Sequence, residues 1–283
     1  MKCRLVDVFT SQKFRGNGLT IFYEFESLTD EEMLVLTQEM RQFESIFLSG
    51  GPGRWSARIF TMEEELEFAG HPLLGLAYHL HQLHGSATES QEWQIHLNGR
   101  EVTLSSRWED DGAFRASMSQ GKPMHLKTLS YDEAAGFYEA LSLSPEAGVP
   151  YSAEVITTGL PYLILPVNGH LDIIKFNVPD LSSLLASYGA KFIYVLDIGT
   201  FEGRTWDNAG KVEDIATGSA AGPAAVYIFR QGLMQKNPII VFQGRFCGRP
   251  SEIEVLLEFD GKNISNVQVA GNVVDVADIS FSS

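Results

Sequence analysis

Cysteine is almost absent from this sequence of 283 residues, in which only Cys3 and Cys247 occur. Two cysteines cannot build the disulfide framework of a secreted scaffold, and they exclude metal sites made of four thiolates. Long apolar runs are missing too, because no stretch approaches the roughly 18 residues of a membrane helix. Asp7 interrupts the apolar N-terminal residues before a secretory signal could form. We therefore expect a cytoplasmic protein without a membrane partner.

Positive charge is also in short supply. The sequence has 21 Lys and Arg against 36 Asp and Glu, and its formal net charge is −15. A chain this acidic lacks the basic surface that binds phosphate backbones, so nucleic-acid binding is not expected. With 44% hydrophobic and 20% charged residues, the composition is that of a globular protein. The length fits one large domain or two of ordinary size.

Helix and strand signals follow one another irregularly along the chain. Two capping boxes, Thr29-x-x-Glu32 and Ser130-x-x-Glu133, each predict the start of a helix. Further helices are expected at 70–85, at 218–230 and, as a short one, at 181–186. Strands dominate and few connections resemble βαβ units, so the predicted fold class is α+β with mostly antiparallel strands. The expected strands are 5–9, 19–23, 45–48, 58–60, 93–97, 102–105, 114–118, 162–167, 192–196, 239–243, 253–257 and 267–276.

The two most apolar helices begin alike. Ala69-Gly70-His71-Pro72 opens one, and Thr217-Gly218-Ser219-Ala220 opens the other, 148 residues later and thus close to half a chain length away. Each follows acidic residues and an aromatic strand, Arg58-Ile59-Phe60 in the first case and Arg204-Thr205-Trp206 in the second. Helix starts made of small residues are common, so coincidence is the alternative to an internal repeat.

The repeat predicts two similar lobes. The first covers residues 1–120 and the second residues 121–273, and the segment 274–283 is free to return to the first lobe. In each lobe strands wrap around a central helix that is unusually buried. Alanine and glycine dominate both helices, which suits close packing inside a shell of strands.

Glycine at both helix starts has a specific chemical use. The first turn of a helix leaves backbone N–H groups unpaired and carries about half a positive charge. Gly70 and Gly218 would let an anion approach these amides, with donors added by His71 and Ser219. If both helix starts face one another, they could bind one carboxylate despite the acidic net charge. The alternative is that each glycine only permits a tight turn.

Glu44 is the first candidate for acid/base chemistry. It lies where the first helix gives way to a strand, among Phe43, Ile46 and Phe47. Apolar surroundings raise the pKa of a carboxyl group and make it a usable general acid/base near neutral pH. The alternative is a solvated glutamate at a helix end.

Asp214 and His71, next to the paired helix starts, are the other titratable candidates. His71 at a helix N-terminus should favour the neutral imidazole. Which of the two would supply a second acid stays open.

No pattern calls for a metal or a cofactor. We interpret His79, His81 and His84 as cations at a helix end rather than as metal ligands, since no acidic residue stands at ligand spacing. The stretch 218–222 lacks the Lys-Ser/Thr ending of a phosphate-binding loop. The sequence also has no Rossmann glycine fingerprint, no HExxH motif and no Gly-x-Ser-x-Gly elbow.

Several motifs together resemble the PhzF-like isomerase family of phenazine biosynthesis, which shares its fold with diaminopimelate epimerase and proline racemase. The resemblance runs nearly from end to end. The Gly-His-Pro and Glu-Asp-x-x-Thr-Gly-Ser-Ala motifs are its most specific parts. The matching segments are 6–10 with Gly16-Asn17, 43–47, 58–61, 65–72, 158–161, 213–221, Gln243-Gly244 and 248–251.

The resemblance implies a fold and a set of site residues. It implies two lobes, each a β-barrel-like shell around one helix, with the active site between them. It implies that Glu44 is the general acid/base and that His71 and Asp214 share the catalytic work. Substrate binding would fall to Asn17, Gly70, Gly218 and Ser219. The epimerase relatives use cysteines at the two helix starts, and because neither cysteine lies there in this sequence, two-thiol racemisation is excluded.

The predicted function is therefore a cofactor-independent isomerase that moves a proton between carbons of a small carboxylate substrate. Two alternatives stay open: an epimerase or racemase of such a substrate, and a binding protein that kept the fold without turnover. The substrate itself cannot be named from the sequence, and a homodimer is left open.

Overall fold

The computed structural model describes residues 1–281, which form two compact units. Unit 1 consists of Met1–Ser119 and residues 270–281, and unit 2 consists of Gln120–Val269. The strand β16 (Asn263–Ser280) contributes residues to both. Residues 282 and 283, the end of the segment free to return to the first lobe, lie outside the described residues.

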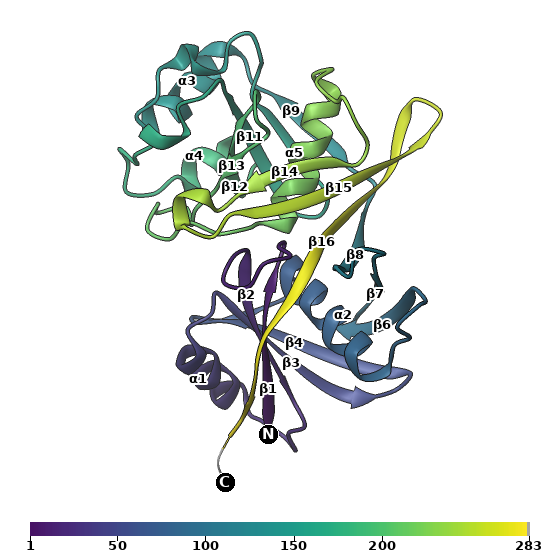
Figure 1. Ribbon diagram of the computed structural model, residues 1–283. Coiled ribbons are helices and arrows are strands. Elements are labelled where there is room, and N and C mark those ends of the chain that lie inside the picture. Colours follow the sequence, from purple (N-terminus) through teal and green to yellow (C-terminus); the bar gives the residue numbers. More distant parts are fainter. Residues whose placement is uncertain (282–283) are drawn as a thin grey trace. The chain divides into compact units, whose positions relative to one another are not determined.

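Unit 1 is built on a sheet that closes on itself (Figure 1). The strand order is β1-β2-β3-β4-β6-β7-β8-β16, and β16 also pairs with β1. The pairs β2–β3 and β4–β6 are parallel, whereas the pairs β1–β2, β3–β4, β6–β7 and β7–β8 are antiparallel. The expected barrel-like shell is thus confirmed. The elements before β16 are β1 (Lys2–Val8), β2 (Asn17–Tyr23), α1 (Asp30–Met40), β3 (Glu44–Gly51), β4 (Arg54–Thr61), β5 (Glu65–Leu66), α2 (Gly70–His84), β6 (Gln91–Leu97), β7 (Arg100–Trp108) and β8 (Phe114–Gly121).

Helix α2 is the central helix of this shell. It packs against β1, β2, β3, β6 and β7, and every residue from Gly70 to His81 is buried. A Cβ at Gly75 would lie 2.3 Å from Leu19 Cδ2 and 3.2 Å from Val6 Cγ2, so only glycine lets the helix approach β1 and β2 this closely. Helix α1, in contrast, buries only Met33 and Thr37.

Unit 2 combines a five-stranded sheet with a second group of strands. The sheet has the order β13-β12-β11-β10-β9 and is antiparallel except for the pair β11–β12, while β14, β15 and β16 lie side by side. The elements of unit 2 before β16, with η denoting a 3₁₀ helix, are β9 (Met124–Thr128), α3 (Tyr131–Ala140), η1 (Pro145–Gly148), β10 (Glu154–Thr157), β11 (Pro161–Val167), η2 (Leu171–Ile173), α4 (Ser182–Ser187), β12 (Phe192–Asp197), β13 (Gly203–Arg204), α5 (Gly218–Arg230), β14 (Ile239–Gln243), η3 (Arg245–Cys247) and β15 (Ser251–Asp260).

Helix α5 packs against strands of both groups, namely β10, β11, β12, β14 and β15. Gly218 and all residues from Ala220 to Ile228 are buried. Helices α3 and α4 are less buried and belong to a separate apolar cluster with alternate residues of β11. The prediction that α2 and α5 are the most buried helices of their halves is therefore confirmed.

Within residues 1–281, no helix is long and apolar enough to span a bilayer. Both capping boxes are present, with Thr29 and Ser130 each accepting the predicted backbone hydrogen bond. Three strands, β5, β9 and β10, were not expected from the sequence.

Candidate active site

Glu44 is a buried carboxyl group in unit 1. It is the first residue of β3, lies beside Leu19 of the parallel strand β2, and is only 7% exposed. Ile46 and Phe47, which follow it on the strand, are 0% and 1% exposed. The alternative of a solvated glutamate at a helix end is therefore wrong.

His71 is the nearest titratable partner of Glu44. Its Nδ1 lies 3.0 Å from Oε2 of Glu44, and its side chain is 6% exposed. Burial lowers the pKa of His71 to about 3, against the opposing effect of a backbone hydrogen bond with Gly18. The predicted neutral imidazole is confirmed, although burial is the largest cause. The contact with Glu44 thus joins a carboxyl group to a neutral ring and is not an ion pair.

The start of β2 lies at this same place. Asn17 is fully buried opposite Val8 of β1, and Gly18 follows it. The turn before it requires glycine, because Gly16 has φ +63° and a Cβ there would lie 2.3 Å from the Val8 carbonyl oxygen. Gly70 is buried at the start of α2, whose N-cap residue Ala69 makes no side-chain capping hydrogen bond. Unit 1 therefore groups Asn17, Glu44, Gly70 and His71.

The start of α5 carries the candidates of unit 2. Asp214 accepts hydrogen bonds from the Thr217 hydroxyl and from the backbone N–H of Ala216. The Gly218 carbonyl accepts one from Nε2 of Gln120 at 2.9 Å, and the Ser219 hydroxyl lies 2.9 Å from that of Tyr162. As for Ala69 in α2, the N-cap residue Thr217 makes no side-chain capping hydrogen bond to the first turn of α5.

Gln243 organises this segment, a role that sequence reasoning missed. It is 1% exposed, and its Oε1 accepts hydrogen bonds from the Thr217 backbone N–H and the Tyr194 hydroxyl, both at 3.2 Å. Its Nε2 donates to the Asp214 carbonyl at 2.8 Å and to the Thr217 hydroxyl at 3.0 Å. The only signal in the sequence was the motif Gln243-Gly244, which carried no role.

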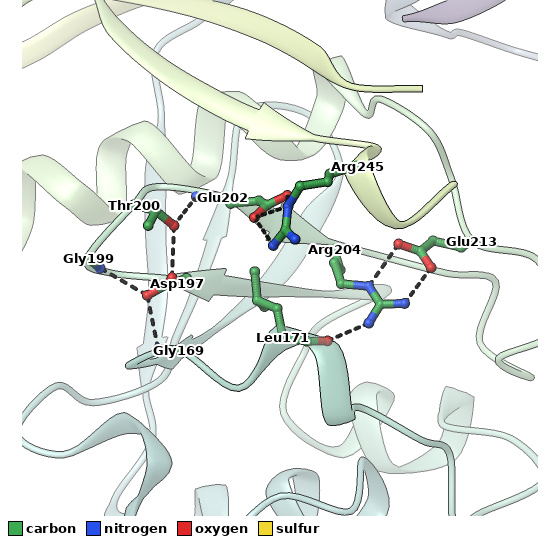
Figure 2. A network of polar contacts seen from close by, with 9 residues as sticks. All are labelled: Gly169, Leu171, Asp197, Gly199, Thr200, Glu202, Arg204, Glu213 and Arg245. Carbon is green, nitrogen blue, oxygen red and sulfur yellow. Dashed lines mark hydrogen bonds and ion pairs between the residues drawn. The ribbon is translucent and has the colours of Figure 1, made fainter. Parts of the chain in front are cut away.

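Glu213, the residue before Asp214, belongs to a network of polar contacts (Figure 2). Arg204 donates through Nε to Glu213 at 2.8 Å, pairs with the same carboxylate through Nη2, and donates through Nη1 to the Leu171 carbonyl. Asp197 accepts from the N–H groups of Gly169 and Gly199 and so closes the turn after β12. Glu213, the residue before Asp214, is thus held in a fixed orientation.

Within residues 1–281, the structure shows neither a thiol with a lowered pKa nor a cluster of metal ligands. Burial raises the pKa of both Cys3 and Cys247 to about 11, so both thiols are protonated at neutral pH. Residues 1–281 contain no group of three or more His, Cys, Asp or Glu side chains arranged to hold a metal ion. The interpretation of His79 as a helix-end cation is wrong, since burial lowers its pKa to about 3.

Solved structures place this architecture in a known fold class. A probable proline racemase from Agrobacterium radiobacter matches with a TM-score of 0.53 at 12% identity over 99% of this chain and 92% of its own. A PhzF-family phenazine biosynthesis protein from Bacillus anthracis matches with a TM-score of 0.82 at 23% identity over 99% and 98%. The chain thus has the α+β fold that racemases and PhzF proteins share.

Sequence similarity then defines the family. The family model described as phenazine biosynthesis-like protein matches residues 6–278. A trans-2,3-dihydro-3-hydroxyanthranilate isomerase from Pseudomonas aeruginosa is 30% identical over 95% of this chain and 94% of its own. A solved structure of a predicted epimerase, also from Pseudomonas aeruginosa, is 43% identical with a TM-score of 0.90 over 100% and 99%. The chain belongs to the phenazine biosynthesis-like family, and it is an isomerase of the PhzF type.

Proposed function

We propose that this isomerase moves a proton between carbons of a small carboxylate substrate by general acid/base catalysis without a cofactor. The observation that carries the proposal is the buried Glu44 carboxyl, 3.0 Å from a neutral His71. A carboxyl group held in this way can take a proton from carbon and return it. The relatives named trans-2,3-dihydro-3-hydroxyanthranilate isomerase support a substrate in which the carboxylate sits on an unsaturated ring.

The two remaining titratable residues receive different roles. Burial lowers the pKa of His71 to about 3, so the ring is neutral at pH 7 and His71 is a poor source of protons. We assign it the task of orienting Glu44. Asp214, whose carboxylate is fixed by Thr217 and Ala216, is assigned the second proton transfer.

Backbone amides at Gly70 and Gly218 would bind the substrate carboxylate, with Asn17 and Ser219 as further polar contacts. The N-cap residues of α2 and α5, Ala69 and Thr217, make no side-chain capping hydrogen bond. This supports the role, because N–H groups and the helix dipole at a helix start attract anions. A helix start that binds the substrate carboxylate would supply a local positive site, which the net charge of −15 withholds.

Valine at Gly70 or at Gly218 should weaken carboxylate binding by up to about 30-fold, since a helix end contributes at most about 2 kcal/mol. The measurement is the KM for substrate, or the affinity for sulfate by calorimetry. Gly136→Ala in α3 is the control, because a Cβ there meets open space. Unchanged affinity in both valine variants, with the fold preserved, would remove the helix starts from binding.

The proposed function is tested by incubating cyclic dienes that carry a carboxylate with the protein in heavy water. We expect deuterium at a new carbon and a shifted double bond in the product. Deuterium with inverted configuration and unchanged connectivity would identify an epimerase, the second candidate, which the 43% identical relative titled a predicted epimerase supports. Binding without any exchange would refute catalysis.

A further inference from the structure

One arginine–glutamate pair stands ahead of α2 in unit 1. Arg58 on β4 donates through Nε to Oε1 of Glu65 at 2.7 Å, and its Nη2 pairs with Oε2. Phe60, two residues after Arg58, is the strand partner of Glu65, and the guanidinium carbon lies 5.1 Å from its ring. Glu65 precedes Gly70, the first residue of α2, by five positions.

The same arrangement stands ahead of α5 in unit 2. Arg204 on β13 donates through Nε and Nη2 to the two carboxylate oxygens of Glu213, as Figure 2 shows. Trp206, two residues after Arg204, bridges to Glu213 in antiparallel fashion, and the guanidinium carbon lies 4.7 Å from its ring. Glu213 again precedes the first helical residue, Gly218, by five positions.

We propose that Arg58–Glu65 and Arg204–Glu213 are equivalent positioning clamps, each of which fixes the segment that leads into a helix start of the site. This inference rests on the proposed function. The four residues touch no reacting atom, so they are positioning residues. A planar guanidinium that holds a carboxylate through two parallel hydrogen bonds fixes its orientation as well as its distance.

The energetics of partly buried ion pairs favour positioning over stability. Partial removal of two charges from water offsets much of their attraction, and solvent screening weakens the rest, so neither pair adds much net stability. The two parallel hydrogen bonds of each pair instead fix the orientation of the glutamate side chain. In unit 1 the segment after Glu65 is also held by Asn98, whose Nδ2 donates to the carbonyls of Leu66 and Glu67. In unit 2 Gln243 holds the segment after Glu213.

The two clamps differ in burial, which ranks their expected effects. The side chains of Arg204 and Glu213 are 10% and 14% exposed. The guanidinium carbon of Arg204 lies 4.2 Å from the centre of the Phe246 ring. The side chains of Arg58 and Glu65 are 33% and 30% exposed. A less exposed fork has fewer alternative conformations, so disturbing the clamp of unit 2 should matter more.

The test replaces each arginine by lysine, which keeps the charge but cannot form the fork. Arg204→Lys should lower kcat for solvent isotope exchange by about 10- to 100-fold with KM within about threefold, because small misplacement of catalytic groups acts on kcat. Arg58→Lys should lower kcat by a smaller factor. Glu213→Gln should match Arg204→Lys, and in both variants the Thr217 amide should exchange hydrogen faster.

The matched control is the ion pair at the other end of α5. Arg230 donates through Nε to Glu154 at 2.7 Å, and Arg230→Lys should leave kcat and the exchange of the Thr217 amide unchanged. The clamp proposal would be refuted if folded Arg204→Lys kept the wild-type kcat and the wild-type exchange of the Thr217 amide. It would also be refuted if Arg230→Lys lost as much kcat as Arg204→Lys. If the wild type catalyses no exchange, the proposed function fails, while the amide measurement still decides whether the pair positions residues 213–218.

Discussion

Glu44→Gln should lower the rate of solvent isotope exchange by about 10⁴-fold, the upper range for a single acid/base group. Glutamine has almost the same shape but cannot take up or release a proton at neutral pH. Since Glu44 is 7% exposed, a neutral amide there loses less hydration than a carboxylate would, so the fold should survive. Mass spectrometry of the substrate in heavy water measures the rate, and circular dichroism checks the fold.

Glu92→Gln is the control for this experiment, because Glu92 is an exposed glutamate on β6 of the same unit. It should exchange at the wild-type rate. If Glu44→Gln retains wild-type exchange while folded, Glu44 is not the acid/base and the proposed mechanism is lost with it.

Unit 1 should lose stability steeply as the pH falls below about 6. Burial lowers the pKa of both His71 and His79 to about 3, whereas a histidine in the unfolded chain titrates near 6.5. A group whose pKa is lowered on folding stabilises the fold fully above its unfolded pKa and progressively less below it. Since the unfolded state binds two more protons, the free energy of unfolding should fall by about 3 kcal/mol per pH unit.

Urea denaturation between pH 5 and pH 7.5 measures this slope. His79→Leu should halve it, because His79 is fully buried and neither of its ring nitrogens has a hydrogen-bond partner within residues 1–281. His84→Gln, at the exposed end of the same helix, should leave the slope as in the wild type. A wild-type slope near zero in this range would mean that the histidines protonate within the folded protein.

Local signals were sufficient for much of the fold. Each capping box is closed by residues three positions apart, so the sequence alone predicts it. The strand β9, Met124–Thr128, was missed because four of its five residues are exposed and the alternation of its two apolar residues, Met124 and Leu126, is too short to mark a strand. The strand β10, Glu154–Thr157, has four buried residues and includes a glutamate that pairs with Arg230, a partner 76 positions away. Only tertiary contacts reveal such a strand.

The same limit applies to the site. Glu44 and His71 were named from sequence, but their contact joins β3 to α2 and needed the fold. Gln243 and Tyr194 could not be found, since a buried glutamine is recognised by its partners and these lie 26 to 49 positions away. The sequence showed that Arg58 and Arg204 occupy equivalent positions in the two halves. That Glu65 and Glu213 are their partners became apparent only from the hydrogen bonds in the structure.

The strand β16 sets a condition on the synthesis of this protein. Unit 1 needs it between β8 and β1, yet the 150 residues of unit 2 are translated first. At about 5–20 residues per second, the ribosome leaves the N-terminal strands without their last neighbour for about 8 to 30 s. During that interval β1 and β8 present unpaired backbone edges, which are templates for pairing with other chains. A nascent chain should therefore depend on protection from association until its last strand emerges.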